Sequence, residues 1–228
     1  MFRWLKPELP QAEGAFSKST PLDALRYVVL DTEMTSLDRR SNRLLSIGAI
    51  AMDGSRIKVG EQFYRVVNPG VPVPAESVVI HRLRSQDVEG GEPCAKALQD
   101  LCRFIQDAVL VGHFVSLDLK LLRKEMDGTG HELNNLAVDT ARVHQWILRH
   151  QRYSDDLPMQ LEKLDLTALA THYGLEVHDA HHALDDAFLT ARVWQVMMHK
   201  AQAQGIRNLG DLLRIAGAPR FPGRWFHS

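Results

Sequence analysis

The order of its apolar segments restricts this chain to few folds. Extended apolar runs come first, and later in the chain short apolar runs alternate with helical patterns. Asp53 and Gly54 join two of the early runs, and an Asp-Gly pair between extended runs is typical of a β-hairpin. We therefore predict an antiparallel meander of three strands, over Tyr27–Leu30, Leu44–Met52 and Ile57–Val67.

Helical patterns dominate the second part of the chain. Two further strands are predicted, over Val109–His113 and Leu136–Val138. Helices are predicted over Pro93–Gln106, Val115–Met126, a segment starting near Asp139, Leu166–Tyr173 and Ala183–Lys200. Strands that come first and then alternate with helices predict an α/β fold, in which helices flank a mixed sheet made of an antiparallel meander followed by parallel strands.

Composition and charge exclude several classes of protein. With 45% apolar and 24% charged residues among 228, the chain is an ordinary globular mixture that can bury one sizeable core. A formal charge of −1 argues against binding to nucleic acid or membrane through bulk positive charge. Cys94 and Cys102 form no disulfide framework, and no apolar run reaches the roughly 18 residues of a membrane span. We expect a cytoplasmic protein without membrane contact.

The charge is unevenly distributed along the chain. Residues 1–199 carry 22 basic and 27 acidic residues, whereas residues 200–228 carry five basic residues and one acidic residue. We expect an N-terminal arm at 1–25, one main domain at 26–200 and a basic C-terminal extension at 201–228, packed on or near the domain. Basic and aromatic residues in the extension suit contact with a nucleic-acid strand.

Acidic residues stand at the ends of predicted strands. Asp31 and Glu33 follow the first strand, and residues two apart in an extended segment point to the same side. An isolated pair of this kind is more often a polar turn with a capping Asp, so further acids are needed before it indicates a site. Asp118 lies one turn into the helix predicted after Val109–His113, although an acid in the first turn of a helix is also common.

A third acidic segment begins the last long helix. His181 and Asp186 are five residues apart, so on one helix they would not share a face. We expect His181 in the loop before the helix and Asp186 in its first turns. Histidines near aspartates also occur in zinc sites, but those favour three closely spaced nitrogen ligands. Four carboxylates with one histidine fit Mg²⁺ or Mn²⁺ better.

Four carboxylates in one site would repel one another unless cations neutralised them. Two divalent ions about 4 Å apart would do so, and that arrangement suits in-line attack on a phosphodiester. One ion would generate a hydroxide nucleophile, the other would stabilise the leaving 3′ oxygen, and a histidine would accept the proton of the water. The sequence therefore predicts a phosphodiester hydrolase that uses Mg²⁺ or Mn²⁺.

Three segments resemble, in order, the motifs of the DEDDh 3′-to-5′ exonucleases. They are Asp-Thr-Glu-Met-Thr-Ser-Leu-Asp at 31–38, Val-Gly-His-Phe-Val-Ser-Leu-Asp at 111–118 and His-His-Ala-Leu-Asp-Asp-Ala at 181–187. The pattern is similar to that of the proofreading epsilon subunits of bacterial DNA polymerase III and covers about residues 26–198. The resemblance implies a ribonuclease H-like fold and release of nucleoside monophosphates from the 3′ ends of single-stranded DNA.

The resemblance also implies roles for individual residues. Asp31, Glu33 and Asp186 would hold the first metal ion, Asp31 with Asp118 would hold the second, and His181 would be the general base. In a sister group a tyrosine stands four residues before the last aspartate, and this chain has a histidine there, which favours the histidine class.

Nucleotide contacts are implied for Met34, Thr35 and Phe114. Phe114 is a departure, because the family often has Asn after the preceding histidine. Ser36 and Arg82 are further departures, since each stands where Gly is common. These positions touch the nucleotide pocket rather than the metal ligands, so the resemblance constrains the chemistry more than the substrate.

Two other functions stay open at this stage. Glu-Met-Thr at 33–35 is similar to oligoribonuclease, which implies an RNA-directed exonuclease as the alternative. A non-catalytic nucleic-acid-binding module is less favoured, because no acid of the set and no histidine is lost. A DNA polymerase or a repair protein is the expected class of partner, although the short segment after Lys200 favours a free-standing enzyme. The sequence does not indicate an oligomeric state.

Overall fold

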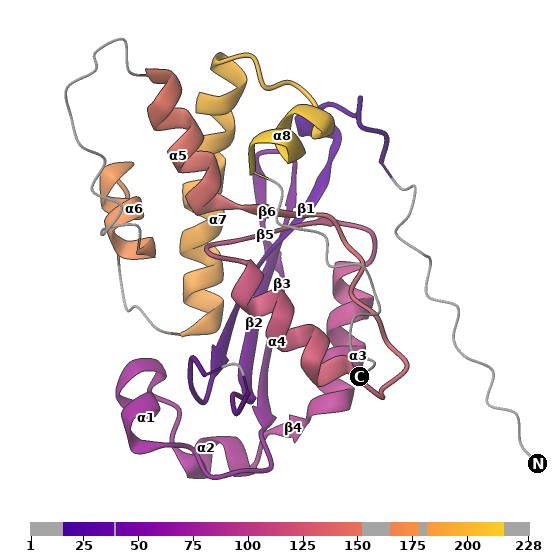
Figure 1. Cartoon of the computed structure of the whole chain (residues 1–228), viewed down its shortest axis with the longest axis vertical. Coiled ribbons are helices and arrows are strands. Elements are labelled where there is room, and N and C mark those ends of the chain that lie inside the picture. The colour runs from indigo at the N-terminus through magenta and orange to yellow at the C-terminus, as the bar shows by residue number, and fades with distance from the viewer. Residues whose placement is uncertain (1–15, 39, 152–164, 178–181, 217–228) are drawn as a thin grey trace, which may run out of the picture.

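A computed structural model describes residues 16–38, 40–151, 165–177 and 182–216. Its centre is a six-stranded sheet with the strand order β4-β3-β2-β1-β5-β6 (Figure 1). The strands are β1 (Arg26–Met34), β2 (Leu44–Asp53), β3 (Arg56–Asn68), β4 (Glu92–Pro93), β5 (Val109–Gly112) and β6 (Ala137–Asp139).

Helices cover both faces of this sheet. A short 3-10 helix, η1 (Leu22–Ala24), precedes β1. The α-helices are α1 (Ala75–His81), α2 (Ser85–Glu89), α3 (Cys94–Ile105), α4 (Ser116–Met126), α5 (Thr140–Gln151), α6 (Leu166–His172), α7 (Ala183–Ala203) and α8 (Leu209–Ala216). Within the described part of the chain, no helix combines the length and the apolar character needed to cross a membrane.

The predicted mixed sheet is confirmed. Strands β1, β2 and β3 pair antiparallel as a meander, and β5 and β6 continue the sheet parallel to β1. Gly54, in the turn between β2 and β3, has a φ of 55°, a left-handed conformation that favours glycine. The Asp-Gly signal in the sequence therefore marks a real turn.

Alternation along the strands builds two apolar clusters. Val29, Ile50 and Val111 face one side of the sheet, where they pack with residues of α5, α6, α7 and α8. Val28 and Leu110 face the other side and pack with residues of α3 and α4. The two helix layers lie on opposite sides of the strands in Figure 1. This arrangement places the first turns of α4 and α7 near the end of β1.

The structure adds elements for which the sequence shows no clear hydrophobic period. Helices α1 and α2 have seven and five residues, and β4 has two, so none of them is long enough to show a clear hydrophobic period. Helix α8 lies in the segment expected as a C-terminal extension. Its residues Leu209, Leu212 and Ala216 are buried in the cluster that also holds α5 and α7.

Candidate active site

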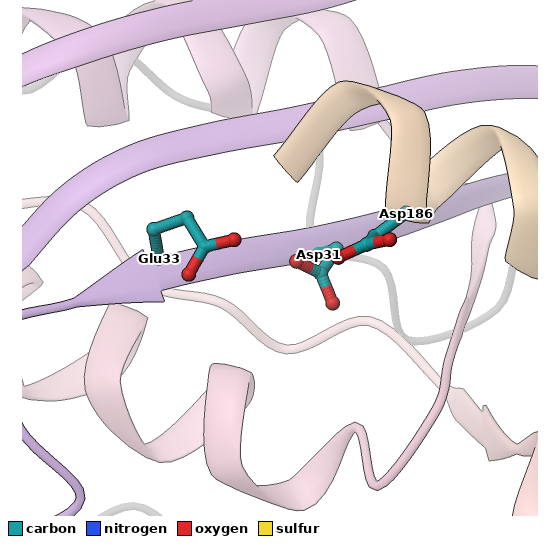
Figure 2. A group of neighbouring side chains, drawn as sticks. All are labelled: Asp31, Glu33 and Asp186. Carbon is teal, nitrogen blue, oxygen red and sulfur yellow. The ribbon is translucent and has the colours of Figure 1, made fainter. Parts of the chain in front are cut away.

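Two acidic residues project from the end of β1 on one face of the sheet. Asp31 and Glu33 are two positions apart in the strand, and the side chain between them, Thr32, points to the opposite face. Asp186 comes from the first turn of α7, where its backbone N–H donates to the carbonyl of His182 at 2.9 Å. Each of the three carboxylates offers an oxygen within 4.8 Å of the others. Figure 2 shows the three side chains around one space between β1 and α7.

Asp118 joins the site from α4. It is buried, with 5% of its surface exposed, and lies in the first turn of the helix that follows β5. Its Oδ1 accepts hydrogen bonds from the backbone N–H of Thr32 at 3.0 Å and from the Thr32 hydroxyl at 2.6 Å. Asp118 lies outside the group of three carboxylates within 4.8 Å, but it is fixed directly to the strand that carries two of them.

The electrostatics of these acids reflect crowding of negative charge. Burial is the main cause that raises the pKa of Asp31 well above its usual value, and the charges of Asp118, Glu33 and Asp186 raise it further. Burial, followed by the charges of Asp186 and Asp118, raises the pKa of Glu33 to about 7. Burial also raises the pKa of Asp118, while the hydrogen bonds from Thr32 oppose that shift.

This donor set fits a hard divalent cation. All three grouped ligands are carboxylate oxygens, which Mg²⁺ and Mn²⁺ prefer over the nitrogen and sulfur ligands typical of zinc. A cation would also remove the mutual repulsion that raises the pKa values of these acids. The acidic cluster predicted from the sequence is therefore present for Asp31, Glu33 and Asp186, with Asp118 beside it.

The remaining predicted residues differ in their surroundings. Met34 ends β1, and its Sδ accepts from the Asn42 side-chain amide at 3.6 Å. Thr35 is buried, its hydroxyl accepts the N–H of Arg43 at 2.9 Å, and its own N–H donates to the Arg43 carbonyl at 2.9 Å. The polar groups of Thr35 therefore close the β1–β2 connection. His181, the predicted general base, lies outside the described residues.

Phe114 occupies an unusual position at the end of β5. Its side chain is 42% exposed, and its φ of 52° lies in the left-handed region. Its ring lies 4.4 Å from the ring of His113, measured between centroids. The left-handed conformation accounts for the Asn that the family often has here, because Asn tolerates it better than other residues with a side chain.

Asp139 supports this turn, a role that the sequence analysis did not assign. Its Oδ1 accepts the N–H of Ala141 at 2.9 Å, as expected of a residue that caps the start of α5. Asp139 is also buried, and burial raises its pKa, while hydrogen bonds from the backbone N–H groups of Ala141, Phe114 and Arg142 oppose that shift. Asp-Thr after a buried strand was the available signal, but the contact with Phe114 depends on the pairing of β5 and β6.

A groove with apolar and basic walls begins at the end of β1. It is lined by Met34, Leu37, Asn42, Leu117, Lys120, Leu121 and Lys124. Leu37 is 80% exposed and Leu117 is 37% exposed. Lys124 donates from Nζ to the Asn42 carbonyl at 2.6 Å, which ties α4 to the segment before β2.

Comparison with known proteins places this site in a family. The family model described as Exonuclease (RNase_T) matches residues 28–194. The chain is 29% identical over 197 residues to a DNA polymerase III subunit epsilon-like protein of Rhodobacter capsulatus, covering 85% of this chain and 27% of that protein. It is 30% identical over 188 residues to the DNA polymerase III subunit epsilon of Rickettsia conorii, covering 80% of this chain and 77% of that protein.

Some relatives are much longer than this chain. A PolC-type DNA polymerase III of Clostridium perfringens is 26% identical over 178 residues, which are 78% of this chain and 12% of that protein. The chain thus spans about a quarter or less of the length of the Rhodobacter and Clostridium relatives.

Solved structures share the fold. Cell-death related nuclease 4 aligns with a TM-score of 0.66 at 13% identity, over 78% of this chain and 64% of that chain. A zinc-bound complex of E. coli Exonuclease I with single-stranded DNA aligns with a TM-score of 0.65 at 17% identity, over 79% of this chain and 41% of that chain. The nuclease domain of 3′hExo, a DEDDh family member bound to rAMP, aligns with a TM-score of 0.63 at 11% identity, over 76% of this chain and 92% of that chain.

The matched residues 28–194 contain both ends of the acidic cluster, Asp31 in β1 and Asp186 in α7. The ordered acids and the mixed sheet with helices on both faces lead to the same assignment as the family model. The chain belongs to the RNase_T family of exonucleases, and its fold is that of the DEDDh type.

Proposed function

We propose that this protein is a metal-dependent 3′-to-5′ exonuclease that releases nucleoside monophosphates from single-stranded DNA. The observation that carries the proposal is the convergence of Asp31, Glu33 and Asp186, with Asp118 fixed beside them, in a chain of an exonuclease family. We assign the exonuclease domain to residues 26–200 and regard 201–228 as an extension of it.

The four acids are divided between two metal ions in this proposal. Asp31, Glu33 and Asp186 would hold one Mg²⁺ or Mn²⁺ ion, and Asp31 together with Asp118 would hold a second. Such ions supply a lowered water pKa and stabilise negative charge on a leaving oxygen. Thr32 holds Asp118 in one orientation through two hydrogen bonds. His181 would accept the proton from the attacking water, a role supported by the resemblance of its motif.

The substrate proposal is supported by the groove next to the acids. Leu37 and Leu117 offer exposed apolar surface in this groove, and Lys120 on its wall suits contact with a phosphate. The exposed aromatic ring of Phe114, outside the groove lining, suits stacking on a base. Among solved relatives of the same fold, Exonuclease I is in complex with single-stranded DNA. Relatives named as epsilon subunits further suggest a DNA polymerase or a repair protein as a partner.

RNA is the alternative substrate, because the solved 3′hExo domain holds rAMP. Matched DNA and RNA oligonucleotides of one sequence distinguish the two directly. The proposal expects a faster initial rate on DNA, and a faster rate on RNA would contradict the substrate while leaving the exonuclease chemistry intact.

The decisive experiment uses two labelled copies of one DNA oligonucleotide. With Mg²⁺ or Mn²⁺, a 5′ label should yield a ladder of shortening products, and a 3′ label should appear at once as a mononucleotide. Asp186→Asn should lower the initial rate by more than about 100-fold. Loss of a residue that only orients a metal ligand typically costs about 10- to 100-fold, and this change removes a ligand itself. The matched control is Asp127→Asn, which makes the same change at an exposed acid beyond the end of α4.

Three results would overturn parts of the proposal. Full activity in the presence of a chelator contradicts the requirement for metal ions. Immediate release of a 5′ label contradicts the polarity. Tight binding of the oligonucleotide without cleavage under any divalent cation contradicts catalysis and supports the binding-module alternative.

A further inference from the structure

One row of residues runs across three strands beneath the start of α7. Asp31 in β1 is paired with Gly48 in β2, and Gly48 is paired with Tyr64 in β3. Directly opposed residues in antiparallel strands share one face of the sheet. A metal-ligand candidate, a glycine and a tyrosine therefore stand side by side on the face that α7 covers.

Gly48 allows α7 to approach the sheet unusually closely. A methyl group at this position would lie less than 3.0 Å from the carbonyl carbon and oxygen of Ala183 and from the amide nitrogen of Leu184. These are backbone atoms of the first turn of α7, so they cannot rotate away as a flexible side chain would. Gly48 does not have a positive φ, so close approach rather than backbone conformation explains the glycine.

Tyr64 contacts the residue just before this turn. Its ring lies 4.6 Å from the ring of His182, between centroids, with the planes tilted by 34°. His182 is the N-cap residue of α7, and its carbonyl accepts the N–H of Asp186 at 2.9 Å. The ring of Tyr64 therefore packs against the residue that closes the first turn of α7 around Asp186.

We propose that Gly48 and Tyr64 are positioning residues that seat the first turn of α7 on the sheet and so bring Asp186 to Asp31 and Glu33. Gly48 sets how closely the turn approaches β2, and Tyr64 sets where its N-cap lies along β3. This inference rests on the proposed binding of divalent cations by the three acids. Both residues would act on the site through the position of α7.

The first test compares two glycine-to-alanine changes. Gly48→Ala should raise the dissociation constant for Mn²⁺, measured by calorimetry without substrate, by about 10-fold or more, the effect typical of residues that orient metal ligands. Gly60→Ala is the matched control, because it lies in β3 with nothing within 4 Å of the added methyl group. Unchanged Mn²⁺ affinity in a folded Gly48→Ala protein would overturn the proposal.

A second pair of variants covers the case in which Gly48→Ala does not fold. Tyr64→Phe keeps the ring against His182 and should keep the Mn²⁺ affinity, whereas Tyr64→Leu removes the ring and should weaken it several-fold. If Tyr64→Leu lowers the melting temperature but leaves Mn²⁺ affinity unchanged, the tyrosine has only a structural role and the proposal fails for it.

A crystal structure of metal-free Gly48→Ala, or of Tyr64→Leu, separates this inference from the proposed function. The displaced helix should move the Asp186 carboxylate beyond the 4.8 Å that now groups it with Asp31 and Glu33. If the Asp186 carboxylate has not moved, Gly48 and Tyr64 do not position it, whatever the activity of the enzyme. If the wild-type protein binds no Mn²⁺, the proposed function is contradicted, and Gly48 and Tyr64 then have no role in metal binding.

Discussion

The Thr32 hydroxyl is the smallest group on which the site depends. It points away from Asp31 and Glu33, yet it donates a 2.6 Å hydrogen bond to the buried Asp118. The middle residue of the first acidic motif thus anchors the acid of the second. A strand and a helix that meet only in the folded protein are held in register by one side chain.

Replacing this hydroxyl should weaken metal use without removing a ligand. In Thr32→Val the backbone N–H of residue 32 still reaches Asp118, but one of the two hydrogen bonds to Oδ1 is lost. We expect the Mg²⁺ concentration for half-maximal rate to rise about 10- to 100-fold. Thr32→Ser keeps a hydroxyl and should restore most of the wild-type value, and a valine variant with the wild-type Mg²⁺ requirement would contradict this role.

Phe114 should affect stability and substrate binding in opposite directions. Phe114→Asn relieves a left-handed residue and should raise stability by about 0.5–1 kcal/mol, measured by urea denaturation. The same change removes the exposed ring and should weaken binding of single-stranded DNA by about 1–3 kcal/mol.

Phe114→Leu separates the two effects, because it keeps the left-handed conformation and loses only the aromatic ring. It should weaken DNA binding without the gain in stability. Equal binding by wild type and both variants would show that this ring does not contact substrate.

Individual residues were predictable from the sequence where a motif was local. Asp31 and Glu33 are two positions apart in one strand, so their spacing indicated a shared face, and Asp186 was indicated by its motif at the start of a long helix. The roles of Thr32 and Gly48 were not predictable. Thr32 binds an acid 86 positions away, and Gly48 meets the backbone of α7, so both roles depend on tertiary packing.

At the scale of elements, segments with a clear apolar pattern were predicted, including the short β5, β6 and α6, whereas α2 and β4 were not. Helices α3, α4 and α7 lie within a few residues of the predicted ranges because each repeats its apolar face over several turns. Helices α1 and α2 follow a proline-containing loop and are stabilised by tertiary contacts, such as Val88 packed with Leu45 and Val73. Their sequences are too short to carry that information.

The turn between α3 and β5 contains a strained residue that can be improved. Gln106 has a φ of 49° and a ψ of −124°, and the N–H of Ala108 donates to the Ile105 carbonyl at 3.0 Å across it. This conformation is the first central position of a type II′ turn, which favours glycine. Gln106→Gly should therefore stabilise the protein by about 1 kcal/mol, measured by urea denaturation.

The same variant should leave exonuclease activity unchanged. Gln106 is exposed at the end of α3, and no site residue lies on that helix. Gln106→Ala serves as the control, since it shortens the side chain and keeps the strain. If the Gln106→Gly protein is no more stable than the Gln106→Ala protein, the left-handed conformation at this position does not lower stability.

At the scale of the whole molecule, the acidic cluster opposes folding when no cation is present. An acid whose pKa is raised in the folded state keeps its proton there after the unfolded chain has lost it. For Glu33 this window runs from about 4.5 to about 7. The contribution of Glu33 to the stability of the metal-free protein is therefore greatest below this window and is lost as the pH rises through it.

Removing one charge should reverse that loss. At pH 8 without metal, Asp31→Asn should raise the melting temperature by a few degrees, since about 1 kcal/mol corresponds to about 2–4 °C in a protein of this size. Mg²⁺ should stabilise the wild type at the same pH and have little effect on the variant. Scanning fluorimetry from pH 4 to 8 measures the melting temperature of both proteins with and without Mg²⁺. A metal-free wild type whose melting temperature does not fall between about pH 4.5 and about pH 7 would contradict charge repulsion among the clustered acids.

The acids of the cluster come from the two ends of the fold, from β1 and from α7. During synthesis β1 is made early, and α7 is made only after all six strands of the sheet. The growing chain therefore has no complete cluster until its last long helix has emerged and docked over Gly48. A nascent chain that lacks α7 therefore lacks Asp186, and the proposed exonuclease activity requires the finished fold.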